Sequence, residues 1–228
     1  MPTFQEIFTT LQTLPPQQRL AAVNKPNRNG YTVLHQAATD PQSLIAILEL
    51  LPDTDRLAAV TTKHTQPQHR TTYSYNTGHT ILSMAYEKDE QSLKAILKLL
   101  PDTEDRLAAV KDTETQGDNI LLQAMYNYET CKMILDLYPP GDRLAAVTSI
   151  MQNHSTILHW ATKDSRALAV IFKIFTPEEL LTAVKKSPSV NQPLLHSATS
   201  DHESLKMILE LYPENERFDA MMETDEKK

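Results

Sequence analysis

The pentapeptide Arg-Leu-Ala-Ala-Val stands at residues 19–23, 56–60, 106–110 and 143–147 of the chain. Two weaker copies follow at 180–184 and 217–221. Successive copies begin 37 residues apart, except that the second step is 50 residues. Self-similarity at a fixed period of this length is the signature of stacked repeats. The sequence therefore predicts an array in which each unit packs mainly on its neighbours.

Three helical patterns recur inside each unit. The first is a Thr-x-Leu-His-x-Ala block, seen most fully at 32–37 and 156–161. The second begins at a column of good helix N-caps, namely Asp40, Asp89, Asn127, Asp164 and Asp201. The third carries the pentapeptide and is expected to be short. We therefore predict an all-α solenoid with units of about 37 residues, each holding two helices and a third, short helix.

The repeat boundaries divide the whole chain. Residues 1–23 match a half unit and are expected to form an N-terminal cap, because terminal repeats must cover an open apolar face. Five repeats occupy residues 24–221, with a long loop at 61–79 in the second repeat. Residues 222–228 form a charged tail.

The run 29–38, Asn-Gly-Tyr-Thr-Val-Leu-His-Gln-Ala-Ala, resembles the ankyrin repeat, in which a glycine turn precedes Thr-Pro-Leu-His-x-Ala-Ala. A second helix ending in a Leu-Leu pair, as at 50–51 and 99–100, is also similar. The period is 37 rather than 33 residues, Val, Ile or Leu replaces the motif proline, and Asp caps replace the usual Gly-His. The resemblance covers residues 24–213 and implies an ankyrin-like array that binds proteins.

Divergent ankyrin-like arrays with a Leu-Pro-x-x-x-Arg-Leu-Ala-Ala-Val pattern look similar to those of effector proteins that intracellular bacterial pathogens deliver into host cells. The resemblance implies a host-pathogen interaction in the host cytosol. The acidic tail at 214–226 is similar to the glutamate-rich C-terminal signals of type IV secretion substrates. On composition alone, a solvated terminus is the simpler interpretation of that tail.

Composition narrows the class of protein further. A formal charge of −7 and a pI near 5.6 argue against nucleic-acid binding, which requires clustered Lys and Arg. The single cysteine, Cys131, indicates a reducing compartment and is expected in the core. The sequence contains no secretory signal of the Sec type and no membrane-spanning run, so we expect a cytoplasmic protein. We also expect a monomer without cofactor or metal.

The loop at 61–79 is the largest departure from the period, with 19 residues where the equivalent loop at 24–31 has 8. Long loops in compact repeats are usually functional or disordered. Aromatic residues and Arg are favoured at interfaces. We predict a partner-binding loop that uses the residues His64, His69, Arg70, Tyr73, Tyr75 and His79. The histidine spacing fits no short zinc motif.

A second surface is predicted from columns that vary between units, since stacking does not dictate those positions. In ankyrin-like arrays the first helices line a concave face. The candidate partner-binding residues on this face are Gln36, Met84, Gln123, Tyr126, Trp160 and Lys163. Trp160 and Tyr126 are the expected anchors, because such residues dominate binding energies. The alternative for Trp160 is that it fills a gap between units.

Two columns have competing interpretations. The arginines Arg19, Arg56, Arg106, Arg143 and Arg217 could recognise an anionic partner, but their recurrence favours bonds to carbonyl groups at the end of the preceding helix. His35, His159 and His196 recur beside the start of the first helix, and a structural role is expected for them.

No motif for phosphate binding, nucleophilic catalysis or zinc-dependent hydrolysis occurs. We therefore predict a non-enzymatic protein-protein interaction module, in its specific form a secreted bacterial effector that binds a host protein through the concave helix face and the loop at 61–79. One alternative is an adaptor or enzyme inhibitor inside the producing cell. Another is a cryptic enzyme that uses the loop histidines.

Overall fold

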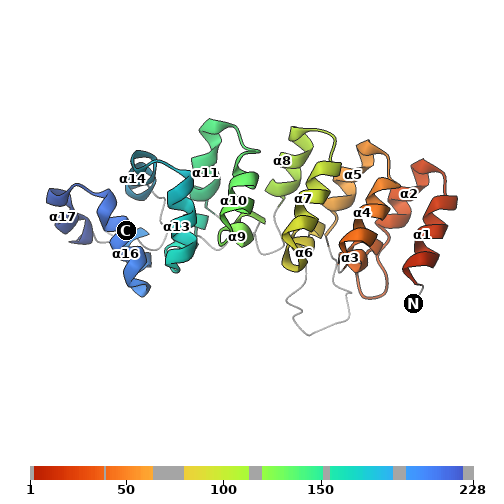
Figure 1. Cartoon of the computed structure of the whole chain (residues 1–228), viewed down its shortest axis with the longest axis horizontal. Coiled ribbons are helices and arrows are strands. Elements are labelled where there is room, and N and C mark those ends of the chain that lie inside the picture. Colours follow the sequence, from red (N-terminus) through yellow and green to blue (C-terminus); the bar gives the residue numbers. More distant parts are fainter. Residues whose placement is uncertain are drawn as a thin grey trace. The chain divides into compact units, whose positions relative to one another are not determined.

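A computed structural model describes residues 3–38, 40–63, 80–112, 120–150, 155–186 and 194–222 of the chain. Every regular element in these ranges is a helix, which confirms the predicted all-α class (Figure 1). The chain divides into two compact units, Met1–Ile120 and Leu121–Lys228. Each unit is described below by itself.

The first unit opens with α1 (Phe4–Thr13) and α2 (Pro16–Val23), which occupy the segment predicted as a cap. The first repeat contains α3 (Val33–Ala37), α4 (Pro41–Glu49) and α5 (Asp53–Val60). The second repeat contains α6 (Ile81–Lys88), α7 (Glu90–Leu99) and α8 (Thr103–Lys111).

The second unit holds the three remaining repeats. The third repeat consists of α9 (Ile120–Ala124), whose first residue closes the first unit, α10 (Tyr128–Leu135), the 3₁₀ turn η1 (Pro140–Asp142) and α11 (Arg143–Thr148). The fourth contains α12 (Ile157–Ala161), α13 (Ser165–Ile174) and α14 (Pro177–Lys186). The fifth contains α15 (Leu194–Ser197), η2 (Ala198–Ser200), α16 (His202–Leu211), η3 (Glu214–Glu216) and α17 (Arg217–Met222).

The predicted caps of the second helices are confirmed. In every repeat the side-chain oxygen of the column residue accepts a hydrogen bond from a backbone N–H in the first turn. Asp89 accepts from the N–H of Gln91 at 3.1 Å, and Asn127 accepts from that of Thr130 at 3.1 Å. These bonds satisfy donors that have no partner within the helix, so they fix where each second helix begins.

The prediction of a short third helix is confirmed for α11 and α17, which have 6 residues each, and is wrong for α5, α8 and α14, which have 8, 9 and 10. Capping residues before the pentapeptide lengthen α8 and α14. Asp102 accepts from the N–H of Asp105 at 2.8 Å, and Thr176 and Glu179 bond each other's backbone N–H reciprocally. Each cap lets the helix begin before the pentapeptide.

Equivalent helices of consecutive repeats pack on one another inside each unit. In the first unit α2 packs on α5 and α5 on α8, while α3 packs on α6 and α4 on α7 (Figure 1). In the second unit α10 packs on α13 and α13 on α16, while α11 packs on α14 and α12 on α15. This is the nearest-neighbour packing that a repeat sequence predicts.

The pentapeptide valine is the buried point of this packing. Val23, Val60, Val110 and Val147 are each at most 1% exposed. The preceding leucines are half-buried. The expected core position of Cys131 is also confirmed, because its side chain is fully buried on α10. Burial disfavours the thiolate and raises the pKa of Cys131 to about 12.

Candidate protein-interaction surface

The six candidate residues of the long loop, from His64 to His79, lie outside the described residues. The structure does describe the two ends of that loop. On the entry side Thr61 caps α5 and donates its hydroxyl to the carbonyl of Leu57 at 2.9 Å. Lys63 forms an ion pair with Asp112, with Nζ and Oδ1 3.1 Å apart. On the exit side the buried Thr80 caps α6. Both ends of the loop are therefore fixed to the first unit.

The first-helix candidates of the first unit lie on two helices that pack together. Gln36 is exposed on α3, and Met84 is half-buried on α6. Since α3 packs on α6, the two positions belong to one helical surface. Gln36 is thus available to solvent, whereas Met84 contributes partly to packing.

In the second unit, the candidates include an aromatic ring held beneath a cation. The indole of Trp160 on α12 is 36% exposed, and the ammonium Nζ of Lys163 lies 4.2 Å from its ring centroid. Contact of this kind between a cation and an aromatic face is worth about 0.5–1 kcal/mol at exposed sites. It orders both side chains at the surface. Trp160 therefore presents part of its ring to solvent, with Lys163 stacked on the other part.

Tyr126 is exposed, with 55% of its surface open to solvent just after α9. The neighbouring candidate Gln123, on α9 itself, is half-buried. Tyr126 lies close enough to Arg166 to contribute, after the Asp164 carboxylate, to the raised pKa of that guanidinium.

Arg166 was not predicted as a candidate from the sequence. It is the second residue of α13 and its side chain is 84% exposed. Its guanidinium bonds both carboxylate oxygens of Asp164, at 3.0 and 2.6 Å, and these bonds with the Arg166 N–H hold the pKa of Asp164 below its usual value. The variable columns of the first helix do not include position 166, so no pattern pointed to it.

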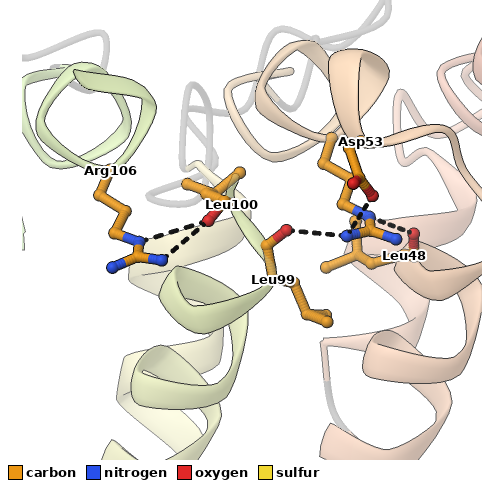
Figure 2. Close-up of polar contacts among 6 residues, drawn as sticks. Leu48, Asp53, Leu99, Leu100 and Arg106 are labelled. Carbon is orange, nitrogen blue, oxygen red and sulfur yellow. Dashed lines mark hydrogen bonds and ion pairs between the residues drawn. The ribbon is translucent and has the colours of Figure 1, made fainter. Parts of the chain in front are cut away.

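The arginine column serves the scaffold, as its recurrence indicated. In all five arginines Nε donates to a backbone carbonyl at or near the end of the helix that precedes it. Arg106, for example, bonds the carbonyl of Leu100 through Nε and Nη2 at 3.3 and 3.1 Å (Figure 2). These bonds satisfy carbonyl groups that a helix C-terminus leaves without a partner.

Two of these arginines also join consecutive repeats. Arg19 on α2 donates through Nη1 to the carbonyl of Leu50, at the end of α4, at 2.7 Å. Arg56 on α5 donates to the carbonyl of Leu99, at the end of α7, at 2.9 Å, while Asp53 holds the same Nη1 at 2.7 Å (Figure 2). Each guanidinium thus ties the end of one second helix to the next repeat. An anionic partner would have to displace these bonds.

The histidine column also has a structural role in the first and fourth repeats. Nδ1 of His35 lies 2.7 Å from Oγ1 of Thr32, and Nδ1 of His159 lies 2.8 Å from Oγ1 of Thr156. Both rings are buried. Each pair closes the first turn of a five-residue helix. These imidazoles are therefore occupied in capping.

Two other kinds of site have no candidate among the described residues. In the described part of the chain, no group of three or more His, Cys, Asp or Glu side chains is placed to hold a metal ion. Among the same residues, no helix has the length and apolar character to cross a bilayer. The candidate surface consists of the residues above.

No protein-family model matches this chain, and comparison with the curated proteins gives no match. The function of the chain is therefore inferred from its own residues and contacts.

Proposed function

We propose that this chain is an ankyrin-like α-solenoid of five repeats that acts as a protein-interaction module and not as an enzyme. The packing of equivalent helices on one another within each unit supports the architectural part of the proposal. A scaffold of this kind offers preformed surface, so a partner binds with little cost of ordering. The specific form proposed is a bacterial effector that binds a host protein.

The observation that carries this function is the exposed Trp160 with Lys163 stacked on its ring, together with the exposed Tyr126. When a partner covers a large aromatic surface that was exposed to water, the free energy falls by roughly 25 cal/mol for each Å² covered. Trp and Tyr are the residue types that most often dominate binding energies. The Lys163 ammonium on the Trp160 ring favours a partner segment that carries a carboxylate next to apolar side chains.

The long loop is proposed as a second contact. Its ends are fixed by the Thr61 and Thr80 caps and by the ion pair between Lys63 and Asp112. Both ends of the loop are therefore attached to the first unit, and the proposal is that its aromatic and basic residues contact the partner from there. A partner that contacts both the loop and the first helices would be bound at two points.

The first experiment is affinity capture from host cytosol, followed by measurement of the dissociation constant for the partner that is identified. Trp160→Ala should weaken binding by about 30-fold, because truncating an anchor residue costs about 2 kcal/mol. Phe218→Ala is the matched control, since Phe218 is an aromatic residue of the same unit that is 67% exposed on α17. It should bind as the unaltered chain does.

Equal affinities for all three proteins would overturn the proposed surface. A fall in the thermal midpoint of Trp160→Ala with unchanged affinity would place this side chain in the packing between repeats. Circular dichroism of each variant separates the two outcomes.

The loop is tested by replacing residues 64–79 with a linker that restores the 8-residue length of residues 24–31. This exchange spares Thr61, Lys63 and Thr80, so the thermal midpoint should be unchanged. Partner affinity should fall, and full affinity in this variant would remove the loop from the interface. Delivery into host cells is tested separately, by fusing the chain to a cytosolic reporter with and without residues 214–228.

A further inference from the structure

A cavity of about 540 Å³ lies in the first unit between α1, α2 and the loop that leads into α3. Ligand pockets in proteins have volumes of roughly 300–1,000 Å³, so the cavity could hold a small molecule. It is separate from Trp160 and Tyr126, which belong to the second unit. The inference drawn from it does not depend on the proposed protein partner.

One wall of the cavity is a loop whose shape is set by its own hydrogen bonds. Oδ1 of Asn27 accepts from the N–H groups of Asn29 and Tyr31, at 2.8 and 3.2 Å. The backbone N–H of Asn27 donates to the carbonyl of Tyr31 at 2.8 Å. Gly30 has φ 82°, a left-handed conformation that glycine adopts without strain. The wall is therefore formed before any ligand arrives.

The lining that this loop shares with the helices is largely apolar. Ile7 comes from α1, Ala22 from α2 and Val33 from α3, and Tyr31 joins them from the loop. All four side chains are half-buried, so each exposes apolar surface to the cavity or its mouth. An apolar molecular body placed here would remove that surface from water.

The charged groups of the lining are both cations. Lys25 and Arg28 line the cavity and are exposed, and no acidic side chain lines it. Neither forms an ion pair with an acid of the described residues. The chain as a whole carries a net charge of −7, whereas the charged groups that line this cavity are both positive. The charge that complements them is negative.

We infer that this cavity binds a small anionic amphiphile, namely an aromatic or branched aliphatic body that bears one carboxylate or sulfonate. The body lies against Ile7, Ala22, Tyr31 and Val33. The anionic head lies at the mouth, beside Lys25 and Arg28. Arg28 can offer two parallel N–H donors to a carboxylate or sulfonate, and Lys25 adds a compact positive charge.

The probe for this site is 1-anilinonaphthalene-8-sulfonate, whose fluorescence rises when it leaves water. Its neutral counterpart N-phenyl-1-naphthylamine has the same aromatic body without the sulfonate. The full chain is titrated with each dye. The sulfonate should bind at least tenfold more tightly than the neutral dye, and added salt should reduce the difference because the charges at the mouth are exposed.

Two variants locate the binding. The double variant K25Q/R28Q should weaken sulfonate binding about tenfold and leave the neutral dye unaffected. Ala22→Leu should reduce the binding of both dyes, because the added side chain fills the cavity. The matched control is K173Q/K186Q, which removes two exposed lysines from the second unit and should change neither titration.

Sulfonate binding that is equally tight in K25Q/R28Q and in the unaltered chain overturns the inference, as does neutral dye that binds as tightly as the sulfonate. Circular dichroism checks that each variant is folded. Since Lys25 and Arg28 are exposed, their replacement should leave the fold intact, and that variant decides the outcome even if Ala22→Leu unfolds.

Discussion

One arginine in every third helix except α14 donates to carbonyl groups at the end of the helix before it. Its fork of donors reaches several carbonyl groups at once, which the single ammonium of Lys cannot do with the same geometry. Recurrence of the residue at every unit but one was enough to predict this role from the sequence. The bonds of Arg19 and Arg56 to the following repeat were not predictable, because they depend on how two units pack.

Arg56→Gln should lower the free energy of unfolding by about 2 kcal/mol, because charge-assisted hydrogen bonds in partly buried positions contribute about 1.5–3 kcal/mol. Arg217→Gln should cost less than half as much, since Arg217 is described with a bond to Tyr212 alone. Urea denaturation of both variants measures the difference. Similar losses for the two would contradict a role for Arg56 between repeats.

Asp201 also links two repeats, because Oδ2 accepts the N–H of Ser165 at 2.8 Å while Oδ1 caps α16. The bond from Ser165 is the main reason that the pKa of Asp201 lies below the ordinary 3.8. A lowered pKa means that the stabilisation is complete above about pH 4 and is lost as the pH falls through the lowered value.

Asp201→Asn should keep the cap, through the amide oxygen, and lose the bond to Ser165. Its thermal midpoint should therefore lie below that of the unaltered chain near pH 7, and the gap should close as the pH falls below about 4. Asp89→Asn is the control, because Asp89 caps only its own helix, through Gln91 and Ser92. A gap that stays constant with pH would show that the carboxylate of Asp201 is not responsible.

Cys131 should be inert in the folded chain. With a pKa near 12 and full burial, almost none of it is thiolate, the form that reacts. Ellman's reagent near pH 8 should find no thiol in the native protein and one per chain in concentrated urea. Rapid reaction of the native protein would mean that α10 opens readily.

At the scale of helices, the sequence was most informative where a cap residue recurs. The starts of the second helices were predictable because Asp and Asn have one clear use before an apolar run. The lengths of α8 and α14 were not, because their capping residues, Asp102 and Thr176, do not recur in a column before every pentapeptide copy. The capping residues determine where such a third helix begins, and the pentapeptide marks only the part that packs on neighbouring helices.

The first helices are too short to be stable alone, so each depends on its cap and its neighbours. Thr156→Ala should lower the free energy of unfolding by about 1–2 kcal/mol, because Oγ1 accepts the N–H of His159 at 3.1 Å and contacts the imidazole. Thr156→Ser keeps the hydroxyl and should recover most of this loss. Equal losses for Ala and Ser would assign the effect to the methyl group of Thr156.

At the scale of the whole chain, the all-α class and the exposed aromatic positions could be predicted, and the detailed sites could not. Lys163 stands one helical turn after Trp160, so their closeness follows from spacing. Arg166 and the cavity beside Tyr31 bring together side chains from separate elements. Only packing decides such neighbours, and one unaligned sequence carries little information about it.

Nearest-neighbour packing also predicts where the chain opens. Leu44→Ala in α4 and Ile171→Ala in α13 each remove a fully buried side chain, at a cost of about 2–5 kcal/mol. Hydrogen exchange should accelerate most in the altered repeat and in those packed on it, and least in the other compact unit. Uniform acceleration along the chain by both variants would show a single cooperative transition.

The Arg56 joint has a consequence for how such a chain can grow. The donor of the joint sits on the third helix of one repeat, and the acceptor is the last turn of the second helix of the next. The first repeat therefore carries both halves of the connection, since Leu50 accepts from Arg19 before it and Arg56 donates to the repeat after it. A second copy of this repeat placed after the first would offer an acceptor to the Arg56 of the first copy and a donor to the repeat that follows.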